Sequence, residues 1–374
     1  MATPEQLDAW TTAGLYDPKA SSASERLEVL ELLVDGEGVS ATELAALGPS
    51  IDLGWVPLLH WIRTEGQLSL SDLAEHSGWG VGELADFLGN SGLPVPAVDA
   101  PAFEPEYVEV FAALHEVGAV FSASVGPKLA QVMGTSLGAL AEAVVAALLA
   151  EIYDPEVETG RTELERVSFN LSARDALVSS MNAIAPLLTL HLRAAATRWM
   201  ATADQIETGS LRIAVGFIDL VGFTGASRGA SPEELRRLVT EFGETAYQIV
   251  SENGGRLVKL IGDAVMYTAE SSAQACNIGL GFVDRFRERR KDMGPRGGVA
   301  MGNLLAHQGD YYGPVVNLSA RIAEQAVPDE ILVAHPVPTE ATADPGLCFD
   351  PAGRRMLKGF EEPVELWSVT RRRG

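Results

Sequence analysis

A short apolar stretch that ends in a single acidic residue constrains the fold of this chain more than any other feature. Residues 212–224 read R-I-A-V-G-F-I-D-L-V-G-F-T, with no charge between Arg212 and Asp219. An apolar run of this length, followed by turn residues, is typical of a buried β-strand. Because an ionised group at the end of such a strand needs a partner of opposite charge, Asp219 is expected to bind a metal ion. Capping of the following turn is the alternative.

A second segment predicts a β-hairpin whose tip carries another carboxylate. Residues 256–268 read R-L-V-K-L-I-G-D-A-V-M-Y-T, in which Gly262 and Asp263 form a two-residue turn. If this hairpin lies beside the first strand, Asp219 and Asp263 reach the same end of one sheet. Two carboxylates so close repel each other, and a pair of divalent ions would remove the repulsion. A Gly-Asp turn without any metal is the alternative.

The second half of the chain alternates strands and helices. Ser231 and Pro232 begin a helix that runs to about Glu252, since Ser is a good N-cap and Pro is favoured in the first turn. The other expected elements are a helix over 271–291, strands over 296–303 and 330–334, a loop over 309–314, a helix from Pro314 and a terminal hairpin over 354–370. This order predicts an α+β fold, with a sheet that is layered on one side by helices. Asn317 and Arg321, four residues apart, would share one helical face and could hold a sugar oxygen and a phosphate, or be an ordinary solvated pair.

Length and charge suggest two regions of different character. A chain of 374 residues exceeds the usual size of one hydrophobic core. Of its formal charge of -23, residues 1–200 hold 28 Asp and Glu against 9 Lys and Arg, and the remainder holds 23 against 19. Such an acidic surface disfavours nucleic-acid binding. Two distant cysteines and a start without a signal peptide favour a cytoplasmic protein.

The first half predicts an all-α region over residues 1–199. Amphipathic helices are expected at 24–33 and 41–47, and residues 70–88 have the rhythm of a helix-turn-helix. Because its second helix offers Glu83 and Asp86 but no Lys or Arg, a packed helical pair is favoured over a DNA-reading one.

The most apolar region, residues 117–153, is interrupted by Lys128, Glu142 and several glycines. Buried helices are therefore expected there, and no membrane span. A helix with a kink at Pro186 and a short linker over 200–210 are expected to follow. The apolar stripe of that helix consists of Leu177, Met181, Ile184, Leu188, His191 and Ala195.

Three separated motifs resemble those of the class III nucleotide cyclases. They are F-I-D-L-V-G-F-T, V-K-L-I-G-D-A-V-M and D-Y-Y-G-P-V-V-N-L-S-A-R, in that order. The resemblance covers residues 211–374 and implies a ferredoxin-like βαββαβ catalytic domain. It also implies a head-to-tail homodimer, with sites at the interface, that converts ATP to 3′,5′-cyclic AMP and pyrophosphate.

The resemblance implies a role for each matching residue. Asp219 and Asp263 would hold two Mg²⁺ or Mn²⁺ ions, and Asn317 and Arg321 would be catalytic, orienting the ribose and stabilising the transition state. The purine would be read by Lys259 and Asp310. The terminal phosphates would meet Lys358, or else Arg354 or Arg355. The turn amides expected to cradle the triphosphate are those of Leu220, Val221, Gly222, Phe223 and Thr224.

The purine pair favours ATP over GTP. A lysine donates to N1 of adenine and an aspartate accepts from its N6 amine, whereas guanine needs the reverse. A guanylate cyclase and a catalytically silent nucleotide-binding module are the alternatives.

The first half also resembles the helical regulatory domains of soluble mycobacterial-type cyclases, some of which inhibit catalysis. Its carboxylates could respond to pH, together with His60, His76, His115 and His191. A small molecule or a lipid could act as effector there. An acidic surface that only solvates the domain is the alternative.

Overall fold

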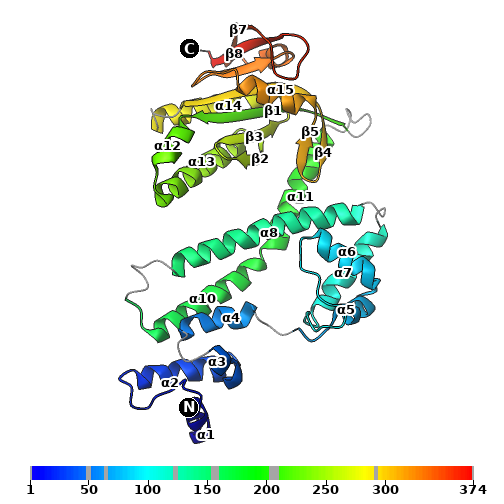
Figure 1. Ribbon diagram of the computed structural model, residues 1–374. Helices are drawn as coiled ribbons and strands as arrows, with labels where there is room; N and C mark the ends of the chain where they lie inside the picture. The colour runs from blue at the N-terminus through cyan, green and yellow to red at the C-terminus, as the bar shows by residue number, and fades with distance from the viewer. Residues whose placement is uncertain are drawn as a thin grey trace. The chain divides into compact units, whose positions relative to one another are not determined.

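The computed structural model describes residues 2–47, 52–62, 66–120, 125–152, 160–201, 210–289 and 294–372. It divides into two compact units, Met1–His191 and Leu192–Gly374 (Figure 1). The boundary between them lies within helix α11, Ile184–Ala201. Most of the expected linker over 200–210 lies outside the described residues.

The second unit is built on an eight-stranded sheet. Its strands are β1 Ser210–Val221, β2 Arg256–Ile261, β3 Ala264–Ala269, β4 Gly294–His307, β5 Asp310–Tyr312, β6 Ile331–Ala334, β7 Leu347–Arg355 and β8 Val364–Arg371. The strand order is β2-β3-β1-β4-β6-β8-β7, and β5 pairs with β4. The run β2-β3-β1-β4 is the order of a ferredoxin-like sheet, so the predicted βαββαβ fold is confirmed. The expected loop over 309–314 is instead partly the strand β5, which pairs with the end of β4 through Ala306 and Tyr311.

Helices cover both faces of this sheet, and the prediction of one-sided layering was wrong. The helices are α12 Phe223–Gly229, α13 Pro232–Glu252, α14 Ser272–Arg289, α15 Pro314–Ala323 and α16 Val337–Glu340. Alternate residues of β1 enter two separate cores: Ala214 and Ile218 pack with α13 and α14, whereas Ile213 and Val215 pack with α15. A strand that is apolar on both faces needs cover on both faces.

Close packing holds α15 against the sheet. The Ser319 hydroxyl donates to the carbonyl oxygens of Val215 and Gly298, at 2.8 Å each. A Cβ atom on Gly298 would lie 2.3 Å from the backbone nitrogen of Ala323. Glycine at position 298 therefore lets the helix approach the strand closely.

The first unit is helical, as predicted. Its elements are α1 Pro4–Thr12, α2 Ala23–Glu31, the π-helical turn Leu32–Gly36, α3 Ala41–Leu47, the 3₁₀ turn Leu53–Trp55, α4 Val56–Ile62, α5 Leu70–Ser77, α6 Val81–Asn90, α7 Tyr107–Val120, α8 Val125–Ile152, α10 Glu163–Met181 and part of α11. Helices α5 and α6 bury Leu73, Leu84 and Leu88 with Phe111 of α7. The helix-turn-helix segment thus forms a packed helical pair.

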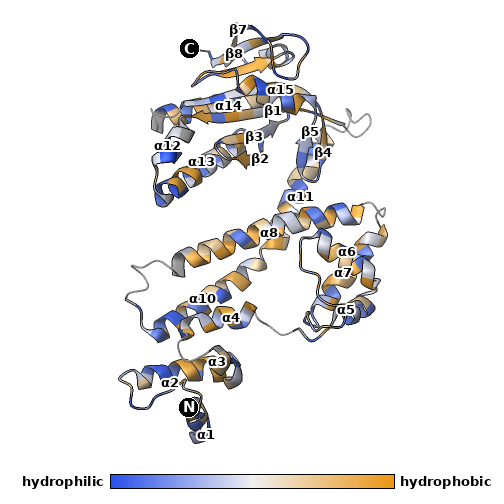
Figure 2. Ribbon diagram, viewed as in Figure 1, coloured by the Kyte–Doolittle hydropathy of each residue, from blue (hydrophilic) through white to orange (hydrophobic). Residues whose placement is uncertain are grey.

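Two expectations for this unit were wrong. The apolar region was expected to be buried, but α8 is one continuous, mostly apolar helix (Figure 2). Apart from the buried Ala130, its described side chains are exposed or half-buried, with Leu137, Leu140 and Val145 among the exposed ones. Among the described residues it is the one helix long and apolar enough to cross a membrane, by length and composition only. The stripe around Pro186 spans two helices, because α10 ends at Met181 and α11 begins at Ile184. Pro186 therefore lies in the first turn of α11 and kinks no helix.

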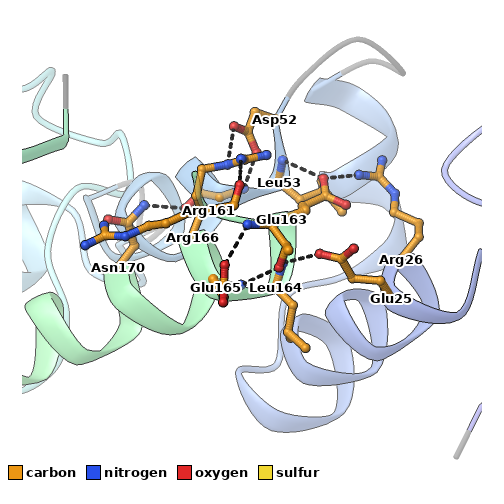
Figure 3. Close-up of polar contacts among 12 residues, drawn as sticks. Glu25, Arg26, Asp52, Leu53, Arg161, Glu163, Leu164, Glu165, Arg166 and Asn170 are labelled. Atoms are coloured by element: carbon orange, nitrogen blue, oxygen red, sulfur yellow. Dashed lines mark hydrogen bonds and ion pairs between the residues drawn. The ribbon is translucent and has the colours of Figure 1, made fainter. Parts of the chain in front are cut away.

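Polar contacts anchor the start of α10 to the helices before it (Figure 3). Glu25 of α2 accepts the backbone N–H of Leu164 at 3.0 Å, and Arg26 forms an ion pair with Glu163. Arg166 lies 2.9 Å from Asp52. Since these contacts join positions more than a hundred residues apart, they set the place of α10 within the unit.

Candidate active site

The two aspartates expected to bind metal lie on neighbouring elements of the sheet. Asp219 is near the end of β1, directly opposite Ala264 of β3, and Asp263 forms the turn just before Ala264. The backbone N–H of Leu220 donates to the carbonyl oxygen of Asp263 at 3.2 Å. The sheet therefore brings the two residues together at one end, as the sequence suggested.

Arg296 of β4 is the cationic partner that Asp219 has in this structure, and the sequence interpretation missed it. Its Nε and Nη2 donate to Oδ2 of Asp219 at 2.8 and 2.6 Å. The two residues are opposite each other in the β1–β4 register. The signal in the sequence was a single charged residue, Arg296, at the start of an apolar strand. Only the strand register shows that its side chain lies beside Asp219.

The donors at this end of the sheet fit a hard divalent ion. Carboxylate oxygens are the ligands that Mg²⁺ and Mn²⁺ prefer. Among the described residues, no group of three or more His, Cys, Asp or Glu side chains could hold a metal ion. An ion bound by Asp219 and Asp263 would thus need further oxygen ligands, and Mg²⁺ commonly takes these from water and from substrate phosphates.

The two residues expected to read the purine form an ion pair with each other. Lys259 lies on β2 and Asp310 begins β5, and the Lys259 ammonium contacts Oδ2 of Asp310. The other oxygen of Asp310 accepts the backbone N–H of Tyr311 at 2.8 Å. Lys259 is opposite Met266, a residue of the core beneath α15, so it points to the same face as Val215. A positive donor and a negative acceptor thus stand side by side.

Asn317 and Arg321 lie on α15, as predicted. Asn317 is exposed and Arg321 is half-buried. Arg321 forms an ion pair with Glu324 one turn later, a partner that sequence reasoning did not identify. In the described part of the chain, the ion pairs of the site join Arg321 to Glu324, Asp219 to Arg296 and Lys259 to Asp310. The structure of one chain does not bring Arg321 into contact with either aspartate.

Not all of the backbone amides of residues 220–224, which were expected to bind phosphate, are available for that role. Gly222 has a φ of 99°, a left-handed conformation that glycine adopts without strain, and it precedes α12. The Leu220 N–H is already used by Asp263, so Leu220 holds the hairpin and its amide is not free for a phosphate. The phosphate-binding prediction stays open for the amides of Val221, Gly222, Phe223 and Thr224.

The basic residues near the C-terminus lie on and after β7. Lys358 is exposed in the turn between β7 and β8. Arg354 donates to the carbonyl oxygen of Pro363 at 3.3 Å, and Arg355 donates to that of Arg354 at 3.3 Å. Because the Lys358 turn is free of these contacts, the expectation for its phosphate role is unchanged.

A pocket of about 680 Å³ lies within the helical unit, between α6, α7 and α8. Its wall includes the rings of Trp79, Phe87 and His115, and the carboxylates of Glu83 and Asp86. No Lys or Arg is among its described lining residues. A volume of this size suits a small-molecule ligand.

Comparison with known proteins gives consistent matches. Residues 207–370 match the Adenylate and Guanylate cyclase catalytic domain. The chain is 30% identical over 301 residues to the uncharacterized protein Rv2212 of Mycobacterium tuberculosis, covering 80% of this chain and 79% of that protein. It is 39% identical over 143 residues to an adenylate cyclase of Streptomyces coelicolor, covering 38% of each. It is 33% identical over 167 residues to the pH-sensitive adenylate cyclase MT1302 of M. tuberculosis, covering 44% of this chain and 42% of that protein.

The family match over residues 207–370 includes the aspartate pair and the Lys259–Asp310 pair. The ferredoxin-like strand order agrees with this match. The chain therefore belongs to the class III nucleotide cyclases, with its catalytic domain in the second unit.

Proposed function

We propose that this protein is an adenylate cyclase, which converts ATP to 3′,5′-cyclic AMP and pyrophosphate. The observation that supports this choice best is the Lys259–Asp310 ion pair. On binding adenine, the ammonium would donate to N1 and the carboxylate would accept from the N6 amine. Guanine presents a donor and an acceptor in the opposite places. The ammonium would then face another donor, and the carboxylate would face another acceptor.

In the proposed reaction the ribose 3′ oxygen attacks the α-phosphorus and pyrophosphate leaves. Asp219 and Asp263 would hold Mg²⁺ or Mn²⁺, two ions per site; when bound, these lower the pKa of the 3′ hydroxyl and neutralise phosphate charge. Asn317 would orient the ribose. Arg321 would stabilise the charge that develops on the α-phosphoryl oxygens, a role that suits a permanently charged planar group. Lys358 and the backbone amides of residues 221–224 would bind the remaining phosphate charge.

A direct assay tests this proposal. The purified full chain, supplied with Mn²⁺ and equal concentrations of ATP and GTP, should form cyclic AMP in excess over cyclic GMP. A preference for GTP would instead make the protein a guanylate cyclase. Nucleotide binding without either product would make it a silent signalling module, which is the second alternative.

We also propose that the active form is a homodimer in the cytoplasm, where ATP is available. The contacts within one chain support a shared site, because Arg321 lies on α15 without contact to the aspartates. A second copy could bring the two sets together, and a two-fold axis would then create two equivalent sites.

The helical unit is proposed to regulate catalysis, through pH or through a bound ligand. One relative of the chain is a pH-sensitive adenylate cyclase, which supports the first route. Three histidines of this unit have defined contacts: His60 lies 2.9 Å from Glu43, His76 lies 2.6 Å from the carbonyl oxygen of Asp72, and the ring of His115 packs on Trp79. Equal activity of residues 205–374 and of the full chain at every pH would exclude a regulatory role.

The pocket between α6, α7 and α8 is the proposed effector site for the second route. Its aromatic and aliphatic lining favours a small molecule or a lipid with an apolar body. Because Glu83 and Asp86 would repel an anion, a neutral or cationic head group is favoured. Filling the pocket by Gly118→Trp should abolish any ligand effect on cyclase activity while basal activity is retained.

A further inference from the structure

We propose that Arg296 is the positioning residue of the metal site: it holds Asp219 by one carboxylate oxygen and leaves the other oxygen to the divalent ion. This inference rests on the proposed cyclase function, because it concerns the carboxylates of that site. The residues are opposite each other on β1 and β4. Their side chains therefore project from the same face of the sheet, at the end where Asp263 also lies.

The geometry of the contact is one-sided. Both Arg296 donors, Nε and Nη2, converge on Oδ2 of Asp219, at 2.8 and 2.6 Å. In the described part of the chain, Oδ1 receives no hydrogen bond. A guanidinium can engage both oxygens of a carboxylate in a fork, and here it does not. About 30% of the Arg296 side chain and 29% of the Asp219 side chain are exposed, so the carboxylate is not sealed from ions in solution.

Such an arrangement fixes the direction of Oδ1. A free aspartate side chain rotates between rotamers, and each rotamer points its oxygens elsewhere. Two hydrogen bonds to Oδ2 select one of these orientations, and the guanidinium keeps its charge at every working pH. This matters here because the described residues offer no third His, Cys, Asp or Glu side chain to complete a metal site. Replacing a residue that orients a metal-binding carboxylate typically costs about 10- to 100-fold in metal affinity or activity.

Arg296 could also affect ion binding in the opposite direction, by competing with the metal ion for Asp219. If Arg296 only occupied Asp219 as a rival cation, removing it would free the carboxylate and strengthen ion binding. If Arg296 orients Asp219, removing it weakens ion binding. The two roles therefore differ in the direction of the change in Mn²⁺ affinity.

Mn²⁺ alone is the probe, titrated into the full chain while free Mn²⁺ is followed by electron paramagnetic resonance. We expect Arg296→Met to weaken binding about 10-fold or more and Arg296→Lys, which keeps one donor group, to fall between. The matched control is Arg287→Met, which removes an arginine from the exposed ion pair with Asp329 and should leave Mn²⁺ affinity unchanged. Binding by Arg296→Met that equals or exceeds that of the unmodified chain would overturn the inference. If Arg296→Met does not fold, unchanged affinity in Arg296→Lys has the same consequence.

A second measurement separates this inference from the metal assignment itself. In cyclase assays, Arg296→Met should raise the Mn²⁺ concentration for half-maximal activity. The increase should match the factor by which the variant raises the dissociation constant for Mn²⁺. Asp219→Asn should weaken Mn²⁺ binding in any case. Loss of binding in Asp219→Asn with normal binding in Arg296→Met refutes only the positioning role. Normal binding in Asp219→Asn refutes both the role of Arg296 and the metal site.

Discussion

At the scale of single residues, Arg321 is a proposed catalytic group in an ordinary surface geometry. Its ion pair with Glu324, three residues later, has the same spacing as that of Arg236 with Glu233 on α13. Exposed pairs of this kind contribute about 0–1 kcal/mol. Arg321→Ala should therefore leave the melting temperature almost unchanged but lower the rate of cyclic AMP formation about 10²-fold or more.

Arg236→Ala is the matched control for this change, because it removes an arginine from the same kind of helical pair. It should retain both stability and rate. Full activity of the Arg321→Ala variant in the same assay would remove its assigned role.

At the scale of elements, the anchor of α10 makes the helical unit sensitive to acid. Glu25 has a pKa lowered from the usual 4.5, chiefly because the Leu164 N–H donates to it and further because the Thr162 hydroxyl does. Since the pKa in the fold is below that in the unfolded chain, the carboxylate stabilises the fold fully above pH 4.5. The contribution is lost as pH falls through the folded pKa. Glu25→Gln should thus lower the melting temperature at neutral pH, with a deficit that shrinks in acid.

The exposed Glu28 on the same helix offers a control, because Glu28→Gln changes the same formal charge without removing this anchor. Melting curves from pH 7 to pH 3 measure both variants. A Glu25→Gln deficit that stays constant over this range would show that its charge does not matter to the anchor.

At the scale of the whole molecule, a shared active site makes a specific prediction about mixed dimers. Asp219→Asn and Arg321→Ala chains should each be inactive alone. When the two are refolded or co-expressed together, one site of a mixed dimer combines an intact Asp219 with an intact Arg321. Activity should then return to about a quarter of the unmodified level for random pairing, since half the dimers are mixed and each has one intact site. No recovery in mixed dimers purified with two different tags would contradict a shared site.

Prediction from the sequence was accurate where neighbours along the chain decide the structure. Ser231 and Glu234 form the capping box that starts α13, and Gly262 and Asp263 form the turn of the hairpin. It was inaccurate where distant segments decide. The residues of β5 look like a loop because their partner strand, β4, ends just before them in the sequence. Helix α8 was expected to be buried because composition does not show what covers a helix.

The sequence by itself determined the local elements and the carboxylate at the end of the first strand, because apolar periodicity, caps and turn residues act over short distances. The ferredoxin-like fold was implied only by the resemblance of three motifs to the class III cyclases. Only the tertiary structure decided that Asp219 meets Arg296 and that Lys259 meets Asp310, across 77 and 51 positions. The second pair joins β2 to β5, which are not paired with each other in the sheet, and the first pair is set by the register of β1 against β4. That register depends on how both faces of the sheet are covered, and no short segment of the chain contains this information.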